Sequence, residues 1–192
     1  MSTQQYDISA IDLSGNHYTV EQNLVRNKYE AYDDHGNTVL KGKQKMLKMK
    51  EEFPFTNAEG NDAFSVKAGS MLDVAGDYML TDARTGADVV LLDNDFSLLQ
   101  DTWRIRDPQT GEKLAEINSR GGTVTMARNL LPLGYLIPHK YEITDKQGRH
   151  VGKIHGQFSM KDRYEITIDD AASVPREATI AAAMVIDAIQ GN

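Results

Sequence analysis

Residues 178–189 read ATIAAAMVIDAI, an apolar run with one charged member, Asp187. Folded as a helix, this run has no polar face. A helix that is apolar all round must be buried on all sides. The rest of the chain therefore has to supply a wall that encloses it.

The residues on either side of this run fit the two ends of a helix. Ser173 and Pro175 are typical of a helix start, and Glu177 is favourable in the first turn. Gly191 is typical of a helix end. The sequence thus predicts a helix over about 175–190, which at about 1.5 Å per residue is about 24 Å long.

The chain before this helix repeats one phrase: an aromatic residue, three residues, Asp or Asn, two or three residues, and Gly. Aromatic residues favour strands, Asp or Asn starts a turn by hydrogen-bonding to the backbone, and Gly takes the positive φ that such a turn requires. Each copy therefore predicts a β-hairpin. The aromatic and glycine positions of the copies are Tyr29 and Gly36, Phe53 and Gly60, Tyr78 and Gly86, Trp103 and Gly111, and Tyr141 and Gly148.

The hairpins supply about ten strands, and alternating segments near 18–24 and 164–168 add two more. Strands that follow one another in antiparallel order leave two exposed edges unless the sheet closes. A barrel of about twelve strands is too wide for its own side chains to fill, and the apolar helix can fill it. The predicted fold is mainly β, a closed antiparallel barrel of about twelve strands around a buried hydrophobic C-terminal helix.

The length of 192 residues suits a single domain. We expect residues 1–16 to be a flexible N-terminal extension and residues 17–192 to form one barrel domain. The polar start MSTQQYD has no apolar signal core, and the longest apolar run is well short of the ~20 residues that span a bilayer. The sequence therefore predicts a cytoplasmic protein without a transmembrane segment.

The composition excludes several functions. Cysteine is absent, which excludes disulfides, cysteine–zinc sites, iron–sulfur clusters and a thiol nucleophile. The formal net charge of −7 argues against a nucleic-acid binder that works through its overall charge.

The spaced Tyr-x3-Asp-x2-Gly hairpins and the apolar helix ending in Val185-Ile186-Asp187-Ala188-Ile189 resemble the LURP-one-related proteins. These proteins belong with the tubby C-terminal domain and the phospholipid scramblases. The resemblance covers roughly residues 17–190. It implies a twelve-stranded barrel around a central helix, and it implies little about activity. Tubby domains bind phosphoinositides and scramblases act on lipids, so the resemblance directs attention to lipids.

The sequence holds no GxSxG, P-loop, GxGxxG or HExxH motif, so we expect no catalytic residue, no cofactor and no enzyme activity. We interpret the histidines as surface residues rather than metal ligands. His150 and His155, for example, are five positions apart and would face opposite sides of one regular strand. The histidines are His17, His35, His139, His150 and His155.

The acidic pairs do not predict a metal site either. Asp93-Asn94-Asp95 begins like a calcium loop but lacks the glycine at its sixth position and the glutamate at its twelfth. Asp169 and Asp170 lie where scramblases carry a calcium-binding segment, but the alternating acidic pattern is missing. We expect these two residues to interact with the helix N-terminus, and Asp187 to lie at the barrel mouth or to pair with a donor.

Two features of the sequence suit binding. The first is the segment KGKQKMLKMK, whose lysines we list as candidate contacts to an anionic lipid: Lys41, Lys43, Lys45, Lys48 and Lys50. In a strand, alternate lysines line one face, and each lysine near an anionic membrane contributes about 1 kcal/mol. The alternative is an outward barrel face on which the lysines guard against aggregation.

The second feature is the apolar segment 130–138, LLPLGYLIP, with basic residues on both sides. A segment of this kind inserts into a membrane interface or a partner's groove. The alternative is a lid that packs over one end of the barrel. The candidate contacts are Arg128, Leu131, Leu133, Tyr135, Leu136, His139 and Lys140.

The leading hypothesis is a non-enzymatic barrel module that binds an anionic lipid, a membrane surface or a protein partner, located in the cytoplasm and peripheral to a membrane. The alternative is a structural or regulatory protein-interaction domain without a ligand. A scramblase-like role is less favoured, because this helix is short, rich in alanine and interrupted by Asp187. A small-ligand carrier is disfavoured because the helix fills the barrel.

Overall fold

The structure is a computed structural model that describes residues 6–23, 28–43, 52–68, 77–96, 101–119, 140–157 and 162–190. This part of the chain forms twelve strands and a long C-terminal helix, α2 (Arg176–Gln190). The strands are β1 (His17–Asn23), β2 (Lys28–Tyr32), β3 (Thr38–Lys43), β4 (Phe53–Thr56), β5 (Asp62–Ala68), β6 (Asp77–Asp82), β7 (Asp88–Phe96), β8 (Asp101–Arg106), β9 (Lys113–Ser119), β10 (Lys140–Asp145), β11 (His150–Gln157) and β12 (Asp162–Ile168).

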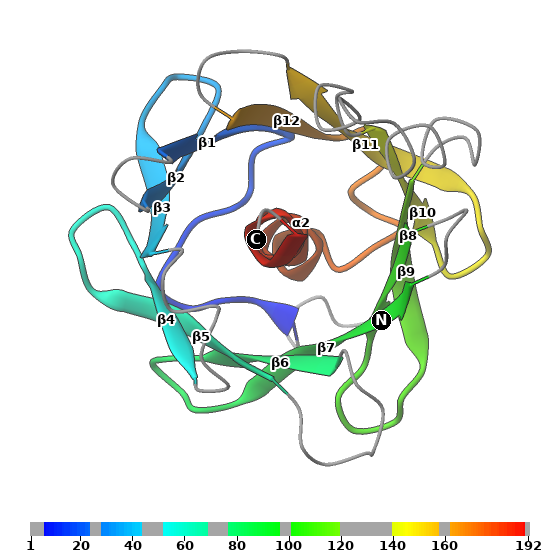
Figure 1. Cartoon of the computed structure of the whole chain (residues 1–192). Helices are drawn as coiled ribbons and strands as arrows, with labels where there is room; N and C mark the ends of the chain where they lie inside the picture. The colour runs from blue at the N-terminus through cyan, green and yellow to red at the C-terminus, as the bar shows by residue number, and fades with distance from the viewer. Residues whose placement is uncertain are drawn as a thin grey trace.

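The strands form a closed barrel in which each strand pairs with its neighbours in the chain. Every pair is antiparallel, and β1 pairs with β12 from His17↔Thr167 to Gln22↔Asp162, which closes the ring. Figure 1 is a view down the axis of the barrel and shows α2 at its centre. The predicted fold class is confirmed.

The helix is enclosed as its composition requires. Residues 178–186 are each at most 2% exposed. The Tyr164 hydroxyl of the wall reaches the carbonyl oxygen of Met184 at 3.5 Å and lies 3.0 Å from the Tyr29 hydroxyl. The side chain of Asp187, for which we expected a partner, lies outside the described residues.

The repeated phrase lines the inside of the barrel. Because side chains alternate along a strand, an aromatic residue, the residue two positions later and the Asp four positions later share one face. In the β8 copy these residues are Trp103, Ile105 and Asp107, and all three are buried. This copy thus places an aromatic ring toward one end of the interior and a turn-forming carboxylate toward the other. All five predicted turn glycines have positive φ, between 69° and 89°.

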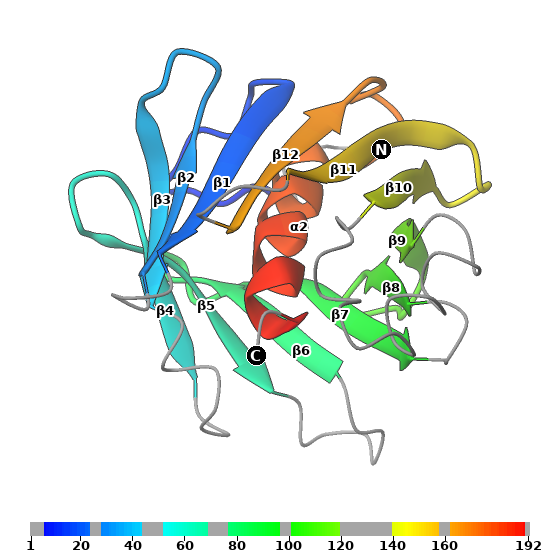
Figure 2. The ribbon, with the colours of Figure 1, turned by 45° about the horizontal axis from the view of Figure 1, so that its top comes forward.

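These five hairpin turns lie at one end of the barrel, which we call the turn end, and α2 begins there (Figure 2). The turn at Asp82 shows why the phrase forms a turn. Its buried carboxylate accepts hydrogen bonds from the backbone N–H groups of Arg84 and Thr85 at 2.9 and 2.7 Å. Burial alone raises the pKa of Asp82, but the hydrogen bonds from Ser9 and Thr85 outweigh it, and the pKa lies below its usual range.

Residues 6–16, which we call the strap, cross the turn end and tie its turns together. The Tyr6 hydroxyl donates to Asp107 Oδ2 at 2.6 Å, and the Ser9 N–H donates to Asp82 Oδ2 at 2.7 Å. The Ile8 N–H donates to Glu177 Oε2 at 3.1 Å in the first turn of α2, where burial raises the pKa of the Glu177 carboxyl. Ile8 is buried in the core. Residues 6–16 of the expected N-terminal extension are thus packed against the turn end.

The strap also protects the start of the helix. Leu13 is fully buried, and Asn57 Nδ2 donates to the Ala10 carbonyl oxygen at 3.3 Å. The strap therefore bonds to the Asp or Asn of three successive turns, at positions 57, 82 and 107. Its own sequence has no strand or helix period, which is why the sequence pattern assigned it to no element.

We expect the helix to be indispensable for the fold. A chain that ends at Pro175 leaves a barrel without its core and should show no cooperative unfolding transition. In the full chain, Ile180→Ala should lower the free energy of unfolding by about 2–5 kcal/mol, because it opens a cavity at a fully buried site. Urea denaturation followed by circular dichroism measures both effects. The half-buried Ile11 of the strap supplies the control, since Ile11→Ala removes less buried area and should cost about half as much. Cooperative melting of the truncated chain would contradict this account.

We expect Tyr6→Phe to lower the free energy of unfolding by about 1–2 kcal/mol at pH 7, because Asp107 loses a hydrogen bond to a charged acceptor. That hydrogen bond holds the pKa of Asp107 below its usual value. The contribution of this hydrogen bond to the free energy of unfolding is therefore fully present above the pKa of about 3.9 that Asp107 has in the unfolded chain. It is lost as the pH falls through the lower pKa that Asp107 has in the folded protein. Burial and Asp107 raise the pKa of Tyr6 to about 12, so Tyr6 itself stays neutral throughout.

Urea denaturation at several pH values tests this prediction. The control is Tyr32→Phe, which removes a 2.9 Å hydrogen bond to Glu30 on the outer wall and should cost less than about 1 kcal/mol. The difference between wild type and Tyr6→Phe should shrink below about pH 4. A difference that is independent of pH would show that Asp107 is not the group responsible.

Candidate functional site

Side chains on the outer wall of the barrel are available to a ligand. On β1, Tyr18 and Val20 point inward and are buried, so Thr19 and Glu21 point outward. The same alternation places Arg163 and Glu165 on the outside of β12, because Tyr164 and Ile166 are buried. Two hollows lie side by side on this part of the wall.

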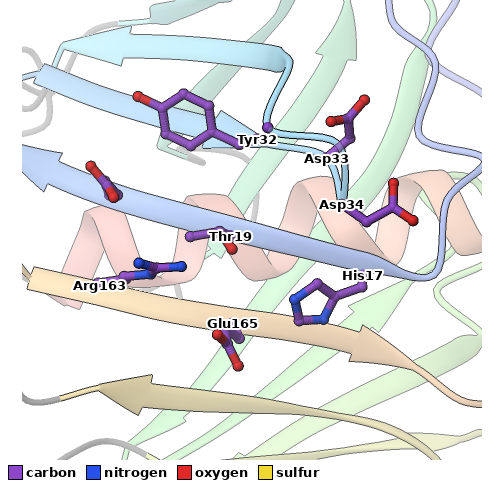
Figure 3. A pocket seen from close by; sticks show the side chains of 9 residues that line it. His17, Thr19, Tyr32, Asp33, Asp34, Arg163 and Glu165 are labelled. Carbon is purple, nitrogen blue, oxygen red and sulfur yellow. The ribbon is translucent and has the colours of Figure 1, made fainter.

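The first hollow, which we call the acidic groove, runs over β2, β1 and β12 and has a volume of about 480 Å³. Figure 3 shows Arg163 and Glu165 on β12, Thr19 on the neighbouring strand, and Asp33 and Asp34 at the turn beyond. The lining residues are His17, Thr19, Glu21, Tyr32, Asp33, Asp34, Gly36, Arg163 and Glu165. Four carboxylates and one guanidinium give this groove a formal charge of −3 when His17 is neutral.

Two carboxylates of the acidic groove belong to the β2–β3 turn. Asp33 accepts hydrogen bonds from the side chain of Asn37 at 2.9 Å and from the N–H of His35 at 2.9 Å, and the Asn37 bond lowers the pKa of Asp33. The Asp34 side chain is 64% exposed and lies 3.5 Å from the His35 ring. Arg163 lies among these acids (Figure 3), and its buried Nε has no hydrogen-bond acceptor among the residues that the structure describes.

The second hollow, which we call the basic hollow, lies over β10, β11 and β12 and has a volume of about 330 Å³. Lys140, Lys153 and His155 are its exposed bases, and within the described part of the chain their side chains make no hydrogen bond or ion pair. The lining residues are Lys140, Tyr141, Lys153, Ile154, His155, Glu165 and Thr167. Two ammonium groups and one carboxylate give it a formal charge of +1 when His155 is neutral.

Strand register places these groups in a row across the wall. Tyr32 is opposite Thr19, Thr19 is opposite Glu165, Glu165 is opposite His155, and His155 is opposite Lys140. Neighbouring strands are about 4.8 Å apart, so this row of five side chains spans about 19 Å. Glu165 lies in the middle of the row and lines both hollows.

The structure brings one predicted contact residue, Lys140, into the basic hollow. Lys41 lies on the outer face of β3, opposite Glu30, and its Nζ donates to the Ala58 carbonyl oxygen at 2.7 Å. Lys43 is the last residue of β3 and its side chain is outside the described part. The other predicted contacts lie outside the described residues: Lys45, Lys48, Lys50, Arg128, Leu131, Leu133, Tyr135, Leu136 and His139.

Sequence reasoning missed Lys153, His155 and Glu165 as candidate site residues. No local motif marks them, because they become neighbours only through the lateral pairing of β10, β11 and β12. The available signal was alternation: Lys153 and His155 flank the buried Ile154, as Glu165 and Thr167 flank the buried Ile166.

Asp93, His150 and Asp169, which were considered as metal ligands, have partners within the protein. Asp93 lies inside strand β7 rather than in a loop, and it pairs with Arg106 at 2.9 Å and Arg104 at 3.6 Å. His150 lies between Glu142 at 2.8 Å and Asp169 at 3.0 Å. Across the described residues, no group of three or more histidine and carboxylate side chains has the arrangement of a metal site.

Asp170 holds the chain that leads into α2. Its carboxylate accepts a 2.6 Å hydrogen bond from the Ser173 hydroxyl and a 3.2 Å bond from the Ala172 N–H. The Ser173 bond lowers the pKa of Asp170. In the described ranges, no helix has both the length and the apolar character that crossing a bilayer requires.

A closed twelve-stranded antiparallel barrel around a hydrophobic C-terminal helix defines a tubby-like protein class. The LURP-one-related family model matches residues 38–187, and the chain belongs to this family. A crystal structure of a protein from Arabidopsis thaliana is similar, with a TM-score of 0.54 and 8% sequence identity. The match covers 96% of this chain and 98% of that chain. At such a low sequence identity, the match shows only that the two folds are similar. No curated protein matches the sequence.

Proposed function

We propose that the protein is a non-enzymatic recognition module that binds phosphate-bearing anionic headgroups at a membrane surface through the basic hollow. The observation that carries this proposal is the set of three exposed bases, Lys140, Lys153 and His155, on neighbouring strands without partners in the described chain. Groups left unpaired on a rigid wall keep their full capacity to bind an anion.

The geometry of the basic hollow suits a phosphate. Lys140 is directly opposite His155, and Lys153 is two positions before His155 on the same outward face. Two ammonium groups therefore lie within one or two strand spacings of the same point on the wall. Each ammonium group has three N–H donors, and the Thr167 hydroxyl adjoins them opposite Lys153.

The neighbouring sequence supports a membrane rather than a free anion as the target. The apolar segment 130–138, which lies outside the described residues, is separated from Lys140 by one residue in the sequence. Apolar insertion and electrostatic attraction to anionic lipid reinforce each other in interfacial binding. The cytoplasmic leaflet carries the negative surface potential, which supports a cytoplasmic location peripheral to the membrane.

The barrel interior supports recognition on the outside rather than chemistry on the inside. The space that holds a ligand in other barrels is taken by α2, whose residues 178–186 are buried against the wall. A ligand that enters here would have to displace the core. Recognition by the outer wall leaves that core intact.

We expect the protein to co-sediment at low salt with phosphatidylcholine vesicles that contain an anionic lipid, and not with phosphatidylcholine alone. Lys140→Gln with Lys153→Gln should weaken binding about 30-fold, at about 1 kcal/mol per lysine. The matched control is Lys113→Gln with Lys146→Gln, which removes the same charge from lysines already paired with Glu116 and Glu112. Absence of wild-type binding, or equal losses in both double variants, would overturn the proposal and favour a protein-interaction domain without a ligand.

A further inference from the structure

We infer that the ligand of the basic hollow carries a primary ammonium group next to its phosphate, as an aminoethyl phosphate does, and that Glu165 selects it by accepting a hydrogen bond from that group. This inference rests on the proposed function and adds the chemical class of the ligand. It is carried by the juxtaposition of the two hollows, because Glu165 lines both of them.

The charge of the outer wall changes sign at Glu165. On one side, His155 is directly opposite Glu165, and Lys140 lies one strand further. On the other side the acidic groove begins, with a formal charge of −3. One end of a ligand that spans this boundary contacts the cationic side chains of the basic hollow, and the other end contacts the carboxylates of the acidic groove.

A purely anionic ligand does not suit this arrangement. A phosphate held by Lys140, Lys153 and His155 lies about one strand spacing, about 4.8 Å, from Glu165. Like charges at this separation repel each other, and every additional anionic group without a neighbouring ammonium group adds to the cost. An ammonium group on the ligand converts the same contact into an attraction.

The length of the ligand follows from the same register. The phosphate end belongs over β10 and β11, and the ammonium end belongs one strand further, over β12. A two-carbon spacer is about as long as one strand spacing. Beyond Glu165, the Glu21 and Asp34 carboxylates of the acidic groove extend the negative potential that holds the ammonium end in this direction.

Two lipids of equal charge test the inference. Phosphatidylserine and phosphatidylglycerol each carry one net negative charge, and of these two only phosphatidylserine has a primary ammonium group, which the choline of the carrier lipid also lacks. With equal mole fractions in phosphatidylcholine vesicles, wild type should bind phosphatidylserine about fivefold more tightly, the upper value for one exposed ion pair. Glu165→Gln should bind both lipids equally, whereas Glu59→Gln, on an exposed turn elsewhere, should keep the wild-type preference.

The outcomes separate the two proposals. If wild type binds neither vesicle, the proposed membrane function fails, and the inference fails with it unless O-phosphoethanolamine still binds in solution. If wild type binds both vesicles equally, or if Glu165→Gln keeps the preference, only the choice of ligand class is overturned.

Soluble O-phosphoethanolamine and inorganic phosphate serve as competitors. Displacement of the protein from the vesicles by O-phosphoethanolamine, at a concentration at which inorganic phosphate has no effect, supports the inference. Equal displacement by the two compounds contradicts it. Binding of O-phosphoethanolamine in solution without vesicle binding would assign the same chemistry to a free metabolite.

Discussion

The fold depends on the enclosure of a helix that has no polar face. Every residue from 178 to 186 must be kept from water, and a single sheet or a helix pair protects only part of such a surface. A closed wall of strands protects all of it and leaves no strand edge unpaired. The alanines at 181–183 keep the helix slender, so the large aromatic side chains of the wall can fill the remaining space.

Enclosure of the helix also fixes where recognition takes place. Because successive side chains of a strand point to opposite faces, each inward residue that packs on α2 fixes the outward position of its neighbours. Burial of Ile154 and Ile166 thereby places Lys153, His155 and Glu165 on the outer wall. A shift of one residue in the pairing of β11 or β12 would exchange these charges with the core. The energetics of the core therefore maintain the geometry of the site, although no core residue needs to touch a ligand.

The sequence predicts much of the fold and little of the site, and the reason is physical. The phrase around Tyr78, Asp82 and Gly86 contains both the strand and its turn within nine residues, so it can be recognised locally. The strap has no such phrase, because it is held by single long-range bonds such as Tyr6 to Asp107. The basic hollow depends on the lateral register of three strands, which no local pattern specifies. Lys140 was identified for a different reason, as the basic flank of an apolar segment.

The same reasoning explains how the fold persists when sequence identity is as low as the 8% seen with the Arabidopsis thaliana protein. The wall requires a pattern, an aromatic residue, an aliphatic residue and a turn carboxylate on one face of a strand, and many sequences satisfy it. The outward positions carry no comparable requirement, since a Lys or a Glu at 153 or 165 leaves the interior unchanged. Within such a family, likeness of fold therefore says little about the ligand. The ligand has to be argued from the outer wall of each chain, which here means the change of charge at Glu165.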